Sequence, residues 1–361
     1  MKTRRQVSAF PFVSVCVDWS YLQVDTHKVQ GLKSFSPQEL LRFSMHQDLG
    51  IGFTDQPAVR NQLKLARHAE AKGFHSVWVA ETRMVRDAVT LLGAIAGCTE
   101  KIRLGSAVIN VWSRIAPLTA LTWSTLDEMA PGRTILGLGA WWDPLASQCG
   151  VRMDMVLTRV REYVQVVRQL LNMQTVTLQG ETLSVKELKL DLGRFVDPSP
   201  KNVPILIGAV APHLLELAGE ISDGVILDSF VSPRYTSKAL KFVSDGAAKR
   251  SKSRVDLQIP QMIYCSVDRD YDLALQRARR PVTRFLSGRD ATSHWIPAAS
   301  GVPLELVNEL AQTVEKHPGK KGLEMCEGIV DDDVVSLLTA SGTVDECIGK
   351  AREYVASGCV L

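Results

Sequence analysis

Short apolar runs alternate along the chain with longer amphipathic stretches from residue 49 onward. The runs predict strands at 49–53, 77–80, 102–109, 134–139, 204–208, 225–227 and 257–267, with an eighth beginning at 358. Between the first two, Val59, Leu63 and Ala66 recur at helical spacing until Gly73 ends the helix. The runs are apolar throughout rather than alternating, which is typical of parallel strands buried on both faces.

The same spacing predicts helices between most of the strands. They cover 59–73, 89–98, 118–129, 153–173, 213–221, 235–252 and 344–357, with a polar segment at 174–203 and a mostly helical insertion at 270–340. This alternation predicts an α/β fold, a (β/α)8 TIM barrel with insertions whose last strand, 358–361, is truncated. A doubly wound sheet is the competing topology, but Gly50-Ile-Gly52 lacks the third glycine of its fingerprint.

The first 44 residues differ from the rest of the chain. Three early basic residues and the apolar run 7–17 resemble a signal peptide, but Pro11 interrupts the run and Asp18 ends it. We therefore expect 1–44 to be an N-terminal extension outside the core, and 45–361 to form the barrel domain.

Composition and charge exclude several classes of function. The net charge is +3, but residues 1–44 hold six of the 42 basic and three of the 39 acidic residues, so the remainder is balanced. A balanced body with no basic run argues against nucleic acid as a partner, and no apolar stretch is long enough for a membrane span. Seven widely spaced cysteines without a CxxC pair predict neither disulfides nor a metal site, and favour a reducing, cytoplasmic location.

In a barrel the chemistry lies at the carboxyl ends of the strands. The residues there are mostly small or aromatic, with few ionisable groups: Gly52, Thr54 and Asp55; Glu81 and Thr82; Asn110, Trp112 and Arg114; Gly139, Trp141 and Trp142; Gly208; Asp228 and Ser229. Such a rim suits a flat aromatic cofactor better than a metal or a nucleophilic triad. Each feature also has a structural interpretation: the glycines as turn residues, the tryptophans as a barrel cap, and Arg114 as the partner of a carboxylate such as Asp127.

The turn from Gly208 to Pro212 is a candidate anion site. A strand ends there in small residues, and the next helix begins at Pro212 with free backbone N–H groups. A phosphate group could approach this turn closely, as it does in the later loops of many barrels.

Many short motifs in order resemble the luciferase-like superfamily of flavin and deazaflavin barrel enzymes, and most closely the branch that contains coenzyme F420-dependent methylenetetrahydromethanopterin reductase. They are Leu49-Gly-Ile51, Ala69-Glu-Ala-Lys-Gly-Phe74, Val77-Trp-Val79, Ile102-Arg-Leu-Gly105, Asn110 with Arg114, Thr125-Leu-Asp127, Pro131-Gly-Arg133, Ile135-Leu-Gly-Leu-Gly139, Ile207-Gly-Ala209 with Pro212, and 217–225.

The resemblance implies positions for the cofactor. The deazaflavin ring would rest on a bulge in the third strand made by a non-prolyl cis peptide at Ala107-Val108. Thr82, in place of a usual His, and Gly139 would also contact the cofactor; Gly208, Ala209 and Val210 would hold its phosphate, and Asp228 or Ser229 would make a polar contact. Two positions depart from the branch: Gly52 stands where a carboxylate is usual, and Ala140-Trp-Trp-Asp143 replaces a Gly-rich loop.

The resemblance implies hydride transfer between coenzyme F420 and a small or pterin-type substrate. Trp112, Trp141 and Trp142 would shield the substrate, Asn110 and Arg114 would orient it, and Asp55 or Glu81 is the candidate acid. The alternatives are an FMN-dependent monooxygenase and a non-catalytic barrel kept for binding. Barrels of this kind commonly pair, so a homodimer is expected.

Overall fold

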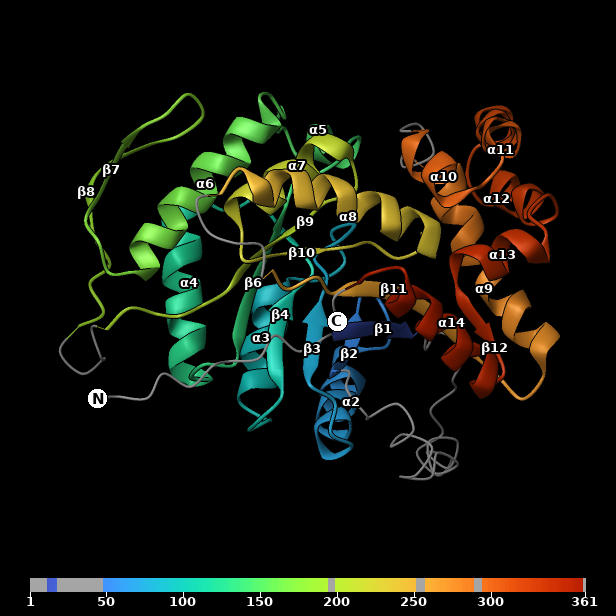
Figure 1. The fold of residues 1–361 in the computed structure, drawn as a ribbon, viewed down its shortest axis with the longest axis horizontal. Coiled ribbons are helices and arrows are strands. Elements are labelled where there is room, and N and C mark those ends of the chain that lie inside the picture. Colours follow the sequence, from blue (N-terminus) through green and yellow to red (C-terminus); the bar gives the residue numbers. More distant parts are fainter. Residues whose placement is uncertain (1–11, 18–47, 194–198, 251–256, 289–293, 360–361) are drawn as a thin grey trace.

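A parallel sheet with helices packed around it forms the centre of the molecule (Figure 1). The computed structural model describes residues 12–17, 48–193, 199–250, 257–288 and 294–359. In the order in which they neighbour one another, the strands are β10 (Gly224–Ile226), β9 (Ile205–Gly208), β6 (Thr134–Gly139), β4 (Arg103–Ser106), β3 (Ser76–Val79), β2 (Asp48–Phe53), β1 (Phe12–Val17), β11 (Gln261–Val267) and β12 (Ala340–Gly342), with β5 (Ile109–Asn110) beside β6.

The predicted alternation of strands and helices is confirmed. Helices covering the sheet are α2 (Val59–Ala71), α3 (Ala88–Ala96), α4 (Ala116–Met129), α6 (Val156–Leu171), α7 (Pro212–Ile221), α8 (Pro233–Ala248) and α14 (Val344–Ala356). Pro212 and Pro233 each occupy the first turn of their helix, where the missing N–H costs no hydrogen bond. The fold is therefore α/β, with a curled parallel sheet.

Backbone hydrogen bonds also join β10 to the segment that leads into β11. The Val225 N–H donates to the Gln258 oxygen at 2.8 Å, and the Met262 N–H donates to the Leu227 oxygen at 2.9 Å. Two isolated parallel bridges, Gly224 with Gln258 and Leu227 with Gln261, lie in the same region. The two ends of the curled sheet thus approach each other here.

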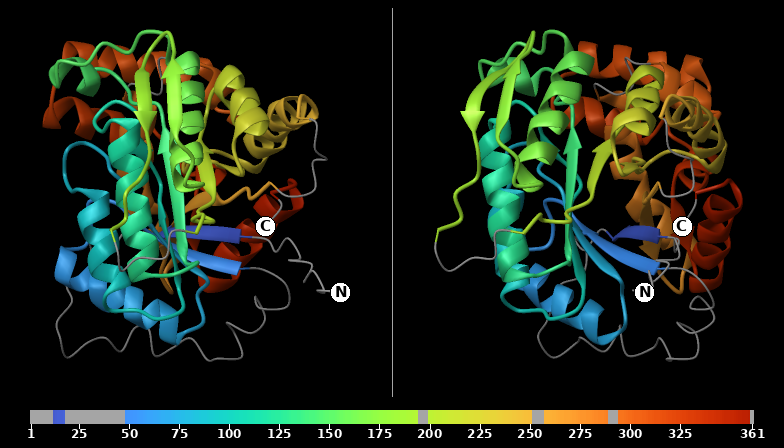
Figure 2. Two further views of the ribbon diagram at one scale, coloured as in Figure 1. Left: turned by 90° about the vertical axis from the view of Figure 1, so that its left-hand side faces the viewer. Right: turned by 60° about the vertical axis from the view of Figure 1, so that its left-hand side comes forward.

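The prediction that all of residues 1–44 lie outside the core is wrong for β1. This strand lies between β2 and β11 and pairs with both in parallel, so that Val13 is opposite both Leu49 and Gln261. Figure 2 shows β1 and β2 side by side. The physical reason is that β2 and β11 would otherwise have open edges, and a β-branched run such as Val13, Val15 and Val17 suits a strand that satisfies both.

Two segments extend beyond the main sheet. The predicted polar segment 174–203 contains an antiparallel hairpin, β7 (Val176–Gln179) and β8 (Ser184–Leu188), which stands apart on one side of the molecule (Figure 2). A four-residue helix α5 (Leu145–Gln148) follows β6, and the insertion before β12 is helical, as predicted. Its helices are α9 (Tyr271–Ser287), α10 (Trp295–Ser300), α11 (Leu304–Lys316), α12 (Lys320–Glu327) and α13 (Asp332–Leu338).

Alternation along the strands divides the core between the two faces of the sheet. Val77 and Val79 belong to the large cluster under the helices, whereas Trp78 belongs to a small cluster with Ile135 and Leu206. The predicted eighth strand is absent from the described part of 358–361, where Gly358 is a turn residue; 360–361 lie outside the described residues.

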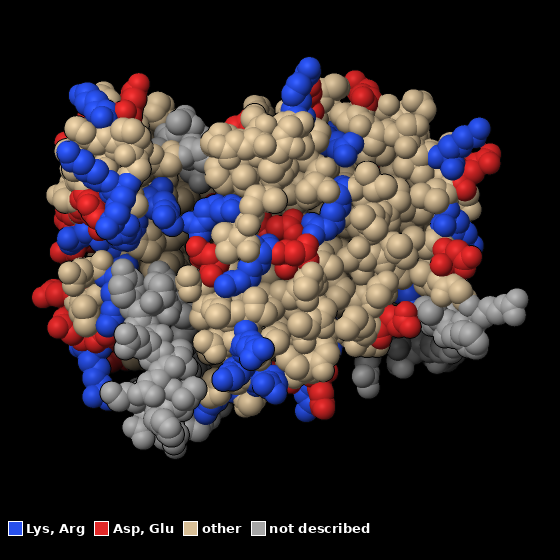
Figure 3. Space-filling view, turned by 180° about the vertical axis from the view of Figure 1, so that it is seen from behind, with Lys and Arg blue, Asp and Glu red and all other residues tan. Residues whose placement is uncertain are grey.

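The distribution of charge on the surface agrees with the balanced composition of the chain. Basic and acidic side chains are interspersed over the face in Figure 3. Among the described residues, no helix is both long and apolar enough to cross a membrane.

Candidate active site

A β-bulge interrupts the third predicted strand at the carboxyl end of the sheet. Gly105 pairs with Ile135 and Ile109 with Leu138, so the bulged strand advances four residues while β6 advances three. The Ser106 hydroxyl bridges the gap: it donates to the Gly137 oxygen at 2.8 Å and accepts from the Gly137 N–H at 2.9 Å. The bulge that the resemblance implied is therefore present, and it divides 102–109 into β4 and β5.

Ala107 and Val108 form the turn of this bulge. The peptide bond between them is cis, as expected. Both residues are half-buried, so solvent reaches the bulge. Their side chains pack on the small inner cluster of Trp78, Ile135, Leu206 and Ile226.

Gly139 and Gly208 adjoin the bulge, each at the end of its strand and paired with the other. A Cβ atom on Gly139 would lie 2.5 Å from Cγ2 of Val108, and one on Gly208 would lie 2.7 Å from Cγ1. Neither glycine has a positive φ. These glycines are required for space beside Val108 rather than for turn conformation.

Glu81 and Arg114 form a bidentate ion pair beside the bulge. The guanidinium donates to Oε2 of Glu81 at 2.8 Å and to Oε1 at 3.0 Å, and it also pairs with Asp87. Burial raises the pKa of Asp87, but hydrogen bonds from Thr90 and the charge of Arg114 outweigh it and leave the pKa below its ordinary value. Arg114 thus pairs with carboxylates, as its structural interpretation anticipated, although Asp127 instead accepts from the Gly132 N–H.

Asp55, the other candidate acid, lies in a second ion pair. Its carboxylate accepts from Arg83 and from the Thr54 hydroxyl, and its backbone oxygen accepts from Arg86 at 2.8 Å. The Asp55 side chain is 32% exposed, compared with 17% for Glu81. The loops after β2 and β3 are therefore tied together by arginines.

Asn110 and Trp112 are engaged with the chain itself. The Asn110 Oδ1 accepts from the Trp112 and Ser113 N–H groups at 2.9 Å and 2.7 Å, which fixes the turn after β5. The Trp112 ring lies under the Arg159 guanidinium, 5.2 Å from its centre, and Arg159 also donates to the Thr182 oxygen in the hairpin. Trp112 consequently packs toward α6 and the hairpin.

The remaining predicted residues lie at the ends of β3, β6, β9 and β10. Thr82, Trp141, Trp142, Val210 and Asp228 are half-buried, whereas Ala209 is buried. The Val210 oxygen accepts from the Tyr235 hydroxyl at 2.9 Å, and Oδ1 of Asp228 accepts from the Ser229 N–H at 2.8 Å. Ala211, the N-cap of α7, makes no side-chain capping bond.

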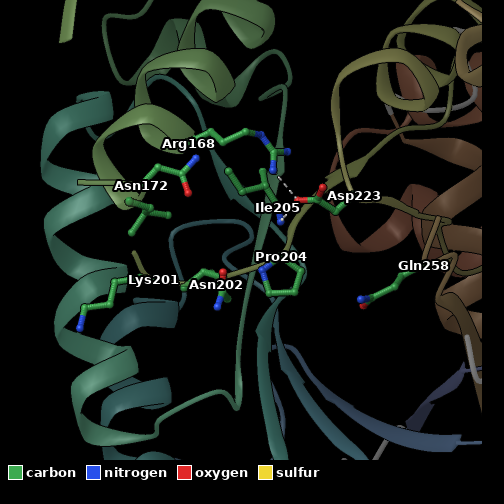
Figure 4. Close-up of a pocket in the computed structure, with 10 residues that line it drawn as sticks. Arg168, Asn172, Lys201, Asn202, Pro204, Ile205, Asp223 and Gln258 are labelled. Carbon is green, nitrogen blue, oxygen red and sulfur yellow. Dashed lines mark hydrogen bonds and ion pairs between the residues drawn. The ribbon is translucent and has the colours of Figure 1, made fainter. Parts of the chain in front are cut away.

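A cavity of about 260 Å³ lies at the other end of the sheet. It is lined by Arg168, Asn172, Asp223 and Gln258 among others, and Figure 4 shows Arg168 and Asp223 joined across it. Asp223 and Gln258 precede β10 and β11, so the cavity faces the amino ends of the strands. Because ligands of parallel α/β sheets bind at the carboxyl ends of the strands, the candidate active site lies at the opposite end from this cavity.

Two contributors to the site have no signal in the sequence pattern. Asp87 lies six residues after Glu81, and no motif shows that both carboxylates share Arg114. Trp78 lies in a predicted strand, and its ring has room because Gly50 and Gly105 on the flanking strands lack side chains. Within the described residues, no three His, Cys, Asp or Glu side chains are placed to hold a metal.

The curled parallel sheet, the helices that cover it and the bulged strand at its carboxyl end define a protein of the α/β class. The chain belongs to the luciferase-like monooxygenase family, whose model matches residues 41–360.

Known relatives agree with this assignment. The chain is 28% identical to the 5,10-methylenetetrahydromethanopterin reductase of Methanolobus tindarius, over 86% of this chain and 91% of the relative. It is 29% identical to the enzyme of that name from Archaeoglobus fulgidus, over 80% and 84%. The coenzyme F420-dependent tetrahydromethanopterin reductase structure from Methanopyrus kandleri superposes with a TM-score of 0.75 at 22% identity, covering 86% of this chain and 90% of that one, which shows the shared fold.

Proposed function

We propose that this protein is an oxidoreductase that transfers a hydride between coenzyme F420 and a small or pterin-type substrate. The names of its relatives support the cofactor and the reaction class. The observation that carries the proposal is the bulge at Ala107 and Val108, which is half-buried at the carboxyl end of the sheet and packs on apolar side chains. Such an apolar, partly open surface fits a planar ring.

The loop from Gly208 to Val210 fits the phosphate end of the cofactor. The N–H groups of the first turn of α7 have no side-chain cap, and Tyr235 anchors the Val210 oxygen. A phosphate beside these residues would be favoured by the helix dipole. Thr82, Ala209 and Asp228 complete the proposed cofactor contacts at the neighbouring strand ends.

When bound, the deazaflavin supplies a hydride at its C5. The task of this chain is then to position the substrate and exclude water. The half-buried Trp141 and Trp142 would shield the substrate, with Trp112 supporting the loop after β5. Asn110 uses its Oδ1 for that loop, so its amide nitrogen is the atom we assign to the substrate.

Asp55 and Glu81 remain the candidate acids. Both carboxylate oxygens of Glu81 accept from Arg114, so Glu81 would have to leave that pair in order to move a proton. Asp55 is more exposed and pairs with one arginine at its side chain. We therefore assign the acid to Asp55, and the orientation of the loops around the substrate to Arg114 and Glu81.

We further propose that the sheet closes as an eight-stranded barrel with β1 in the eighth position. The support is the parallel pairing of β1 with both β2 and β11, and the bridges between β10 and the start of β11. In this arrangement residues 48–359 form one domain with the strand at 12–17. Free thiols at six described cysteines fit the expected cytoplasmic location.

A homodimer is also part of the proposal. Helix α4 and its N-cap residue carry an exposed apolar stripe of Ile115, Leu118, Leu121 and Met129. Their exposed fractions are 64%, 47%, 44% and 49%, which is unusual for large apolar side chains on one helix face. A second copy of the chain would bury this stripe.

Titration with each cofactor tests the function. We expect coenzyme F420 to bind the purified protein, with a change in the absorbance spectrum of the coenzyme. A tetrahydromethanopterin derivative should then change the redox state of the bound coenzyme. Tight FMN binding with substrate-dependent oxygen uptake would instead show that the protein is an FMN-dependent monooxygenase. Binding of neither cofactor would favour the alternative of a non-catalytic barrel that serves in binding.

A further inference from the structure

The Val108 side chain occupies the space that a side chain at Gly139 or Gly208 would need. A Cβ atom on Gly208 would lie 2.7 Å from Cγ1 of Val108, and one on Gly139 would lie 2.5 Å from Cγ2. The two glycines are opposite each other in the pairing of β6 with β9. Real Cβ atoms do not approach neighbours so closely, so a side chain at either position would displace Val108.

The small inner cluster also supports the bulge. Trp78, which is 1% exposed, packs there with Ile226, and the half-buried Ala107 and Val108 pack against them. The Trp78 indole donates to the Ser76 hydroxyl at 2.9 Å, which fixes the ring. A cluster that contains a large, fixed ring resists inward movement of the residues packed on it, because protein interiors are close-packed.

Val108 is also stiff in itself. Its two methyl groups branch from Cβ and leave few accessible rotamers, so a collision at one methyl cannot be relieved by a small rotation. The Ser106 hydroxyl, bound to both backbone groups of Gly137, holds the preceding residue of the bulge. Displacement at Val108 would therefore be transmitted to the backbone of the bulge.

We propose that Val108, held between the glycine pair and the inner cluster that contains Trp78, sets the height of the bulge, and that Gly139, Gly208 and Trp78 are positioning residues for the redox ring. The proposal rests on the proposed function, since it concerns the surface on which the deazaflavin would lie. Hydride transfer is sensitive to displacements of the order of 1 Å, so the height of that surface matters.

A double-mutant cycle between residues 108 and 208 tests the proposal. Gly208→Ala introduces the clash, whereas in the Val108→Ala background the nearest atom of residue 108 is its Cβ, 3.7 Å from the new methyl. We expect Gly208→Ala to weaken F420 binding by about tenfold in the wild-type background and by less than about twofold in the Val108→Ala background. Gly349→Ala, whose Cβ meets nothing within 4 Å, is the matched control and should bind as wild type does.

The readouts are the dissociation constant from F420 absorbance, the near-ultraviolet circular dichroism of the cofactor-free protein, and its melting temperature. Gly208→Ala should change the tryptophan bands, and Val108→Ala should restore them, because Trp78 belongs to the cluster on which the bulge packs. If Gly208→Ala does not fold, Trp78→Phe takes its place and should weaken F420 binding while remaining folded.

The outcomes separate the two proposals. If wild type binds F420 and Gly208→Ala binds it equally well, the positioning role is refuted and the proposed function stands. Equal losses in the two backgrounds would also refute it, since the clash with Val108 would not be the cause. If wild type does not bind F420, the proposed function is refuted and the positioning role falls with it.

Discussion

Arg114 reaches the Glu81 carboxylate with both terminal nitrogens, at 2.8 Å and 3.0 Å, from a loop 33 residues further along the chain. Each side chain is 17% exposed, so the pair is largely removed from solvent. Arg114 also pairs with Asp87, and one guanidinium therefore contacts two carboxylates that follow β3. Glu81 and Arg114, two candidate site residues, thus connect the loop after β3 to the loop after β5.

Arg114→Met should lower the free energy of unfolding by more than the loss of the Arg114 hydrogen bonds alone would. The largely buried Glu81 (17% exposed) would be left without its cation, and so would the more exposed Asp87 (43%), so we expect the free energy of unfolding to fall by about 3 kcal/mol. Urea denaturation measures this change. Arg152→Met is the matched control: its ion pair with Asp154 is exposed (88% and 63%), and a change below about 1 kcal/mol is expected. Equal effects of the two substitutions would contradict the role of Arg114.

Ser106→Ala should weaken the bulge. The hydroxyl accepts from the Gly137 N–H and donates to its oxygen, and both residues are buried. Without it, two buried backbone groups lose their partner, so we expect a loss of about 1–3 kcal/mol in the free energy of unfolding. Ser106→Thr changes the side chain but keeps the hydroxyl. It therefore separates the effect of losing the hydroxyl from the effect of any substitution at residue 106. Ser244→Ala, in which one helical hydrogen bond is lost, is a control with a smaller expected effect.

His75 predicts a specific pH dependence of stability. Burial, with a contribution from the charge of Arg103, lowers its pKa from 6.5 to about 4. Between these values the unfolded chain binds a proton that the folded protein does not, so stability falls as the pH drops from about 6.5 toward 4. His75→Gln should reduce this slope in urea denaturation across that range. His317→Gln is the control, and a slope unchanged in His75→Gln would refute the assignment.

Leu118→Glu with Leu121→Glu should convert the proposed dimer into monomers. Both side chains belong to the apolar stripe of α4, and two charges there would have to be buried in an interface. Light scattering coupled to size exclusion measures the mass. Met325→Glu, at an exposed apolar residue of α12 (43%), is the control and should leave the mass unchanged. A monomeric wild type would refute the dimer itself.

The order of strands and helices was determined by the sequence, because apolar runs and helical spacing report which face of each element is buried. The resemblance of its motifs also indicated the bulge at Ala107 and Val108 and the family. Only the tertiary structure decided which groups are in contact. Val13 pairs with Gln261, and Arg114 forms ion pairs with Glu81 and Asp87 rather than with Asp127. Residue 208 has to be glycine because the Val108 side chain lies beside it. Periodicity is a local signal, whereas these contacts join residues more than 25 positions apart, and their choice depends on how the sheet curls and how closely its strands approach.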